Sequence, residues 1–283
     1  MEIGSNLSTA SNYGDEVTHN DDFSLSIYPR HAEGPYWEGL SGKMGDIRPL
    51  PSKYVLVKTH CGSRCVKCPP SQYVQTLQEY TDACRNSTAR EAPDRRKVNY
   101  LYPVDRVKKV IHLIRNPFHN FVARFHLESK NYEKKGEKEW TKKHPSAPEG
   151  FRQWCADLDN GYKDDEYQTF EYDMLKQVRL SPCHGEVFKY IQWHNMAFAL
   201  TEKYSIPSMV LWYEDFDDKY EETFDALFSF MEFPRVQPTR EFSARHDYDT
   251  YYDHLDRRRM RLLAEKISTK ATWAHVGKYF SKD

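Results

Sequence analysis

Two short polar motifs carry groups that could act on a phosphate or a hydroxyl. Lys58-Thr59-His60 directly follows the apolar run Tyr54–Val57, which is typical of a buried strand. A lysine can neutralise a departing phosphate, and a histidine can take a proton from an attacking hydroxyl. A lysine and a histidine at a strand end also occur as ordinary surface residues, so this motif alone leaves a structural role open.

The second motif, Arg115-Asn116-Pro117, lies where a strand is expected to meet a helix. Val107–Ile114 is the strongest strand candidate in the chain, and Asn116 can cap a helix whose first turn suits Pro117. Parallel strands bind ligands at their carboxyl ends, and helix amino termini favour phosphate. Arg115 adds a charged donor that can hold an oxyanion with two hydrogen bonds. We therefore expect a phosphate site here, with an arginine in an ordinary loop as the alternative.

Cysteines supply a third kind of chemistry, and their number is even. They are Cys61, Cys65, Cys68, Cys84, Cys155 and Cys183. Together with glycosylation sequons at Asn6 and Asn86, they indicate an oxidising, lumenal compartment. Disulfides are the favoured interpretation, with one joining Cys155 to Cys183 and pairs within the other four.

A metal site is the competing interpretation of the first cysteines. Cys61-x3-Cys65-x2-Cys68 has the spacing of a radical S-adenosylmethionine iron–sulfur site. With Cys84 the set could instead bind zinc. Both metal interpretations stay open at this point.

Composition restricts the possible partners. The 283 residues include 41 Lys and Arg against 42 Asp and Glu, for a formal charge of -1. This near-neutral balance argues against a nucleic-acid partner bound by bulk phosphate attraction. No apolar run approaches the ~18 residues of a membrane span. Met1–Asp22 has neither a basic start nor an apolar core, so it is not a signal peptide.

Strands that alternate with helices predict an α/β fold with a mainly parallel sheet. Residues 1–50 are expected to be irregular, with at most one short helix, and 51–283 to form one domain. The segment at about 128–183 is charged and poorly periodic, which predicts a solvated insertion. Further elements are a strand at 208–213 and helices near 71–85, 184–204 and 252–268, with another beginning near Asp218 and Glu221.

Three segments in order resemble the sulfotransferases that use 3′-phosphoadenosine 5′-phosphosulfate. They are the strand ending in "KTH", "VIHLIRNPFHNFVARF" (110–125) and "LWYEDFDDKYEETFDALFSFMEFP" (211–234). The second is closest to the membrane-bound, carbohydrate-type branch, and "CHGEVFKYIQWHNMAF" (183–198) fits its layout. The resemblance covers about residues 50–280. It implies a P-loop-type fold, with a three-layer, mainly parallel sheet flanked by helices.

The resemblance also implies roles for individual residues. Lys58 and His60 match the family's lysine and histidine that act at the sulfuryl group and the acceptor. Arg115 matches the arginine that contacts the 3′-phosphate, and Asn116 and Lys58 complete the expected cofactor-binding set. The serine that the family has eight residues further on is Ala123 here. The implied reaction uses no metal, and its acceptor is a hydroxyl on a glycan or another hydroxyl compound.

One departure from the family concerns its phosphosulfate loop. The family carries a "PKSGTTW"-like turn well upstream of "KTH", whose backbone N–H groups cradle the 5′-phosphosulfate. Nothing in Met1–Tyr54 matches it, so the chain is expected to be N-terminally incomplete, with an upstream anchor and a Golgi location. A catalytically dead fragment or pseudoenzyme is then the alternative. A rival alignment makes "KTHCGSRC" (58–65) itself a degenerate loop.

Overall fold

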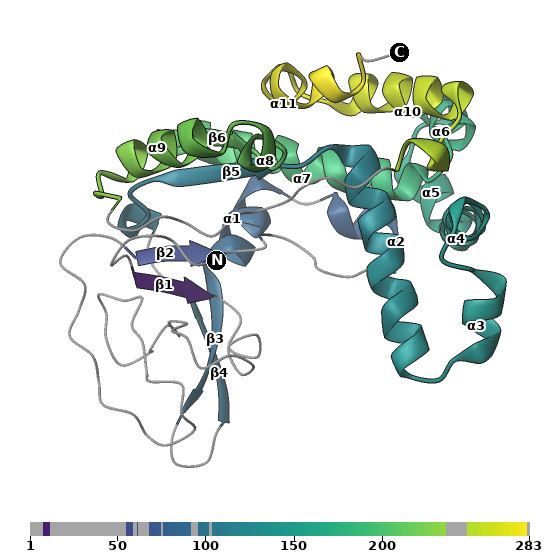
Figure 1. Ribbon diagram of the computed structural model, residues 1–283, viewed down its shortest axis with the longest axis horizontal. Coiled ribbons are helices and arrows are strands. Elements are labelled where there is room, and N and C mark those ends of the chain that lie inside the picture. The colour runs from purple at the N-terminus through teal and green to yellow at the C-terminus, as the bar shows by residue number, and fades with distance from the viewer. Residues whose placement is uncertain are drawn as a thin grey trace.

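The computed structural model describes residues 8–11, 55–58, 61, 68–74, 76–91, 96–101, 104–235 and 248–281. Most of them are helical, and helices surround a short pair of parallel strands (Figure 1). The expected α/β class holds at this level. Within the described ranges the strands form three separate two-stranded sheets, so one large three-layer sheet is not seen there.

The central pair consists of β5 (Val110–Ile114) and β6 (Ser208–Trp212), both near the expected positions. They run parallel, from Val110 opposite Ser208 to Ile114 opposite Trp212. Ile114 is fully buried in the main core, whereas Leu211 packs in a second cluster beneath α9 (Tyr220–Met231). The two strands therefore contribute apolar side chains to both faces, as parallel strands between helices do.

The two further strand pairs include one expected strand, β2 (Val55–Lys58), whereas their other three strands were not expected from the sequence. β1 (Ser8–Ser11) runs parallel to β2 (Val55–Lys58), so the expectation of an irregular 1–50 without strands is wrong at these four residues. Ser-Thr-Ala-Ser has no apolar alternation, and its pairing depends on a strand far along the chain. β3 (Asn86–Glu91) and β4 (Arg96–Leu101) form an antiparallel hairpin that projects from the helical body (Figure 1).

Two long helices form the centre of the main core. α2 (Pro117–Lys134) follows β5, and α7 (His184–Lys203) leads into β6. α2 presents aromatic residues at helical spacing, and the predicted stripe is buried as expected. The buried members from these two helices are Phe118, Phe121, Val122, Phe125, Val187 and Ile191.

Residues 128–183 are largely helical and contribute to the main core, in contrast to the expected solvated insertion. They include α3 (Lys138–Lys143), α4 (Pro148–Gly161), α5 (Lys163–Thr169) and α6 (Tyr172–Leu180). Phe151, Trp154 and Val178 are almost fully buried. Because few apolar residues stand among many charged ones, the helical periodicity of this segment is weak in the sequence. These few buried side chains nevertheless anchor the helices to the main core.

The remaining helices surround this core. They are α1 (Leu77–Arg85), α8 (Asp215–Asp218), α9, α10 (His254–Ile267) and α11 (Lys270–Val276). The expected capping box at Asp218 and Glu221 does not form, because Lys219 interrupts the helix and no side chain caps α9. Asp253 caps α10 instead, and its carboxylate accepts from the N–H of Asp256 at 2.7 Å.

Disulfides join distant parts of the chain. Cys155 is bonded to Cys183, as predicted, and Cys61 is bonded to Cys84, which confirms one pair within the first four cysteines. Cys68 is also disulfide-bonded, while Cys65 lies outside the described residues. A disulfide uses both thiols, so the structure gives no support to thiolate ligands at Cys61 and Cys68.

None of the helices in the described ranges combines the length and hydrophobicity that crossing a bilayer requires.

Candidate functional site

The candidate site lies where β5 ends and α2 begins. The parallel pairing continues one residue beyond β6, since Tyr213 N–H donates to Ile114 O at 2.7 Å. The side chain of Asn116 accepts from the N–H of Phe118 at 3.0 Å, and Pro117 occupies the first helical position. The chain therefore turns directly from strand to helix, as the sequence predicts.

Arg115 is held in this turn through its backbone and its guanidinium. Tyr190 on α7 donates its hydroxyl to Arg115 O at 2.7 Å. The guanidinium carbon lies 4.7 Å from the centre of the Tyr213 ring, a cation–π distance. Arg115 Nε is buried without a hydrogen-bond partner in the described part of the chain, and no ion pair neutralises this cation there. Arg115 is thus a preoriented cation with unused donor capacity.

Glu214, two residues beyond the end of β6, accepts a hydrogen bond from the backbone of the same turn. One of its oxygens accepts from the backbone N–H of Asn116 at 2.9 Å, and the other accepts from the Tyr279 hydroxyl at 2.6 Å. Burial and the Glu214 carboxylate both raise the pKa of Tyr279, so this hydroxyl stays a donor. Because two donors already satisfy Glu214, Arg115 remains available to another anion.

More charged groups surround the first turn of α2. Arg257 lies over the Phe118 ring, 4.8 Å from its centre, and donates to Asp249 at 3.0 Å. Burial lowers the pKa of the His119 imidazole, on which Glu214 and Arg115 act in opposite directions. His119 is therefore mostly neutral near pH 7, and Arg115 is the cation closest to the turn itself.

The predicted site residues fall into three groups. Arg115 and Asn116 lie together at the β5–α2 junction, where Asn116 acts as the helix cap. Lys58 is the last residue of β2, which belongs to a different two-stranded sheet from β5. Thr59 and His60 lie outside the described residues.

Sequence reasoning missed Tyr190 and Glu214. Glu214 could have been found from its position, because it directly follows the strand expected at 208–213 as Arg115 follows the strand expected at 107–114. Neighbouring parallel strands end at the same edge of a sheet, and polar residues after both ends are therefore close. Tyr190 gave no such signal, since a tyrosine within a helix more often belongs to the core.

No protein-family model, no curated protein and no solved structure matches this chain. The functional interpretation therefore depends on the β5–α2 junction and on the motifs of the sequence.

Proposed function

We propose that this protein transfers a sulfuryl group from 3′-phosphoadenosine 5′-phosphosulfate to an acceptor hydroxyl. The observation that carries the proposal is Arg115, an unneutralised arginine held at a parallel-strand end beside a helix amino terminus. Its guanidinium has no anionic partner among the described residues, and a phosphate group would supply one. The junction therefore fits the 3′-phosphate of this nucleotide.

The chemistry is an in-line displacement at sulfur. The bond between sulfur and the bridging phosphate oxygen breaks, and a bond from sulfur to the acceptor oxygen forms. His60 would take the proton from the acceptor hydroxyl, and Lys58 would stabilise the negative charge on the leaving phosphate. Arg115 would hold the nucleotide in register, and no step in this scheme requires a metal. The acceptor we propose is a glycan or another hydroxyl compound.

A Golgi lumen location belongs to the same proposal. The Cys61–Cys84 and Cys155–Cys183 disulfides support an oxidising compartment, where such bonds persist. The sequons at Asn6 and Asn86 are consistent with it. Glycan acceptors pass through that compartment.

Transfer of labelled sulfate is the direct test. The 283-residue chain is incubated with 35S-labelled nucleotide and a panel of glycan acceptors, and product is separated from cofactor. In parallel, calorimetry measures binding of 3′-phosphoadenosine 5′-phosphate. Transfer that depends on both Lys58 and His60 would support the mechanism and favour "KTHCGSRC" as the phosphosulfate loop.

Two other outcomes have distinct meanings. Nucleotide binding without transfer would identify a non-catalytic member of the family, because Arg115 would still function while the reacting end would not. If neither binding nor transfer occurs in folded protein, the proposed function is wrong.

A further inference from the structure

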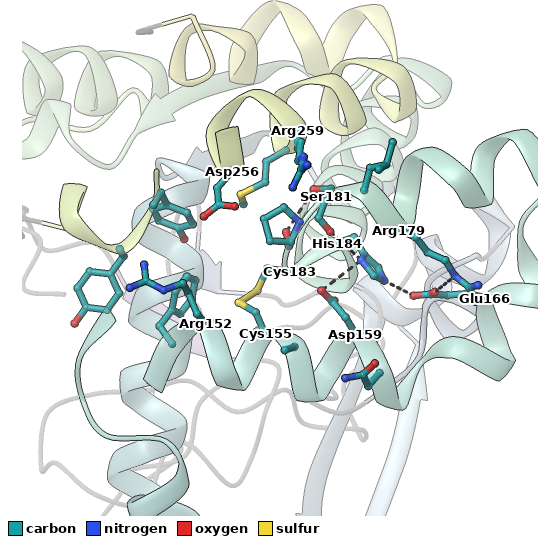
Figure 2. Close-up of a pocket in the computed structure, with 18 of the residues that line it drawn as sticks. Arg152, Cys155, Asp159, Glu166, Arg179, Ser181, Cys183, His184, Asp256 and Arg259 are labelled. Atoms are coloured by element: carbon teal, nitrogen blue, oxygen red, sulfur yellow. Dashed lines mark hydrogen bonds and ion pairs between the residues drawn. A yellow bond between two sulfur atoms is a disulfide. The ribbon is translucent and has the colours of Figure 1, made fainter. Parts of the chain in front are cut away.

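A cavity of about 440 Å³ lies between α4, α6 and α10 (Figure 2). The Cys155–Cys183 disulfide forms part of its wall, and the buried Phe151, Tyr251 and Tyr252 form another part. Its volume falls within the roughly 300–1,000 Å³ of typical small-molecule sites. No residue assigned to sulfuryl transfer lines it.

Three cationic residues from different helices line this cavity. Arg152 belongs to α4, Lys163 to α5 and Arg259 to α10, and all three side chains are exposed. Within the described ranges, none of the three makes a hydrogen bond or an ion pair through its side chain. Exposed arginines on single helices are common, but three unpaired cations around one concavity leave a positive charge without an anion.

Two of the carboxylates in the wall are already neutralised. His184 Nε2 lies 2.6 Å from Glu166 Oε1, and its Nδ1 lies 3.3 Å from Asp159 Oδ2 (Figure 2). Burial opposes a charge on His184, but Glu166 and Asp159 outweigh it and raise the pKa of the imidazole. Arg179 Nε adds a further positive charge, 3.6 Å from Glu166 Oε2.

One carboxylate remains to balance the unpaired cations. Asp256 lies in the first turn of α10, and both Arg152 and Arg259 act on it electrostatically. Burial and Asp253 nevertheless raise the pKa of Asp256, so it holds its negative charge less strongly than an ordinary aspartate does. Three unpaired cations against this single carboxylate give the cavity a net positive potential.

We infer that this cavity binds a small organic anion, through a sulfate, phosphate or carboxylate group held by Arg152, Lys163 and Arg259. Hydrogen bonds hold the two tyrosines of the aromatic wall in place. The Tyr252 hydroxyl donates to Phe118 O at 2.9 Å, and the Tyr251 hydroxyl bonds His126 Nε2 at 3.0 Å. Both hydroxyls are thereby used in hydrogen bonds within the protein.

Calorimetry with four probes tests the inference on the full chain. The probes are glucose 6-sulfate, glucose 6-phosphate, glucuronate and neutral glucose, with inorganic sulfate in a separate titration. Exposed charges bind individually weakly, so we expect a Kd of roughly 0.1–1 mM for at least one of the three sugar anions. Comparison of these anions tells which oxyanion the site prefers, and glucose should not bind.

Matched variants separate the site from general surface charge. Arg152→Gln/Arg259→Gln should weaken the sugar anion about tenfold. Arg258→Gln removes an exposed charge from the same helix but does not line the cavity, and it should leave the Kd unchanged. Ala156→Trp, which fills the cavity without a charge change, should weaken binding, and Arg115→Ala should not.

The inference is overturned by any of three results in folded protein. They are absence of binding by all three sugar anions, equal losses in Arg152→Gln/Arg259→Gln and Arg258→Gln, and inorganic sulfate binding as tightly as the sugar anions. The last result would indicate an adventitious ion only.

Discussion

Arg115 is the residue whose removal most directly tests the nucleotide site. Arg115→Ala should weaken 3′-phosphoadenosine 5′-phosphate binding by about 1–3 kcal/mol, the contribution of a charged hydrogen bond. That is roughly 5- to 150-fold in Kd. Its loss removes the contact with the Tyr213 ring but no ion pair within the described residues, so it should lower the free energy of unfolding by less than about 1 kcal/mol. Calorimetry and thermal unfolding measure the two effects separately.

Lys130→Ala is the matched control for this measurement. Lys130 is an exposed cation on the same helix, far along α2 from the junction, and its removal should leave the Kd unchanged. If Arg115→Ala and Lys130→Ala behave alike, Arg115 has no place in a nucleotide site.

The sequence predicts Arg115 as a site residue but not the two residues that hold it and its neighbour in place. Arg115 was predicted because the expected strand and the expected helix meet at it, which is a local feature. Its anchors are not local: Tyr190 lies 75 residues away in sequence, and Glu214 lies 98 residues from Asn116. Only the packing of α7 and β6 against β5 brings them together, and no local pattern encodes that packing.

At the scale of elements, the start of α2 depends on one side chain. Asn116→Ala removes the acceptor for Phe118 N–H, and the lost cap should cost about 1 kcal/mol of the free energy of unfolding. Asn116→Asp keeps an acceptor and should retain most of the stability. Urea unfolding measures all three proteins. Equal stability of Asn116→Ala and the parent chain would contradict the capping role.

Elements were predictable where local signals agreed. β5 and α2 combine an apolar run, a cap, a proline and helical spacing of aromatic residues. β1 lacks such signals, because Ser8–Ser11 is held by backbone pairing with the distant Val55–Lys58. In α4, Phe151 and Trp154 stand among charged residues, so the helix is stabilised by long-range burial that periodicity alone does not reveal.

At the scale of the whole molecule, His112 on β5 and His194 on α7 are buried, with the half-buried His275 of α11 near them. Burial, and next the neighbouring His275, lower the pKa of His112 to about 4. Burial likewise lowers the pKa of His194 to about 3. The His112 ring packs on Phe198, with ring centres 4.6 Å apart, so protonation would place a charge in the core.

These depressed values predict acid sensitivity. In the unfolded chain histidine takes up its proton near its ordinary pKa of 6.5, whereas folded His112 and His194 do so only near 4 and 3. These two histidines therefore contribute no pH dependence to stability well above pH 6.5. Below it, each histidine should lower the free energy of unfolding by up to about 1.4 kcal/mol per pH unit, until the folded pKa is reached.

Asp159 acts in the opposite direction, so the histidine effect needs a variant to isolate it. Burial raises the pKa of Asp159 to about 6, and its proton uptake favours the folded state below that pH. His112→Leu should reduce the loss of stability between pH 7 and pH 5, whatever its stability at pH 7. Urea midpoints at both pH values measure this, and an unchanged difference would exclude His112 as a cause.

The Cys155–Cys183 disulfide should make the larger covalent contribution to global stability. It joins α4 to the start of α7 with a sequence separation of 28, against 23 for Cys61–Cys84. Loop entropy alone makes the two nearly equal, at about 3–4 kcal/mol each. However, Cys155 and Cys183 are buried in the main core, whereas Cys61 belongs to a small separate cluster. Replacement of the core pair by alanine therefore also leaves a void among packed side chains.

We expect Cys155→Ala/Cys183→Ala to lower the urea midpoint more than Cys61→Ala/Cys84→Ala under non-reducing conditions. The reverse order would mean that the main core does not depend on the α4–α7 connection.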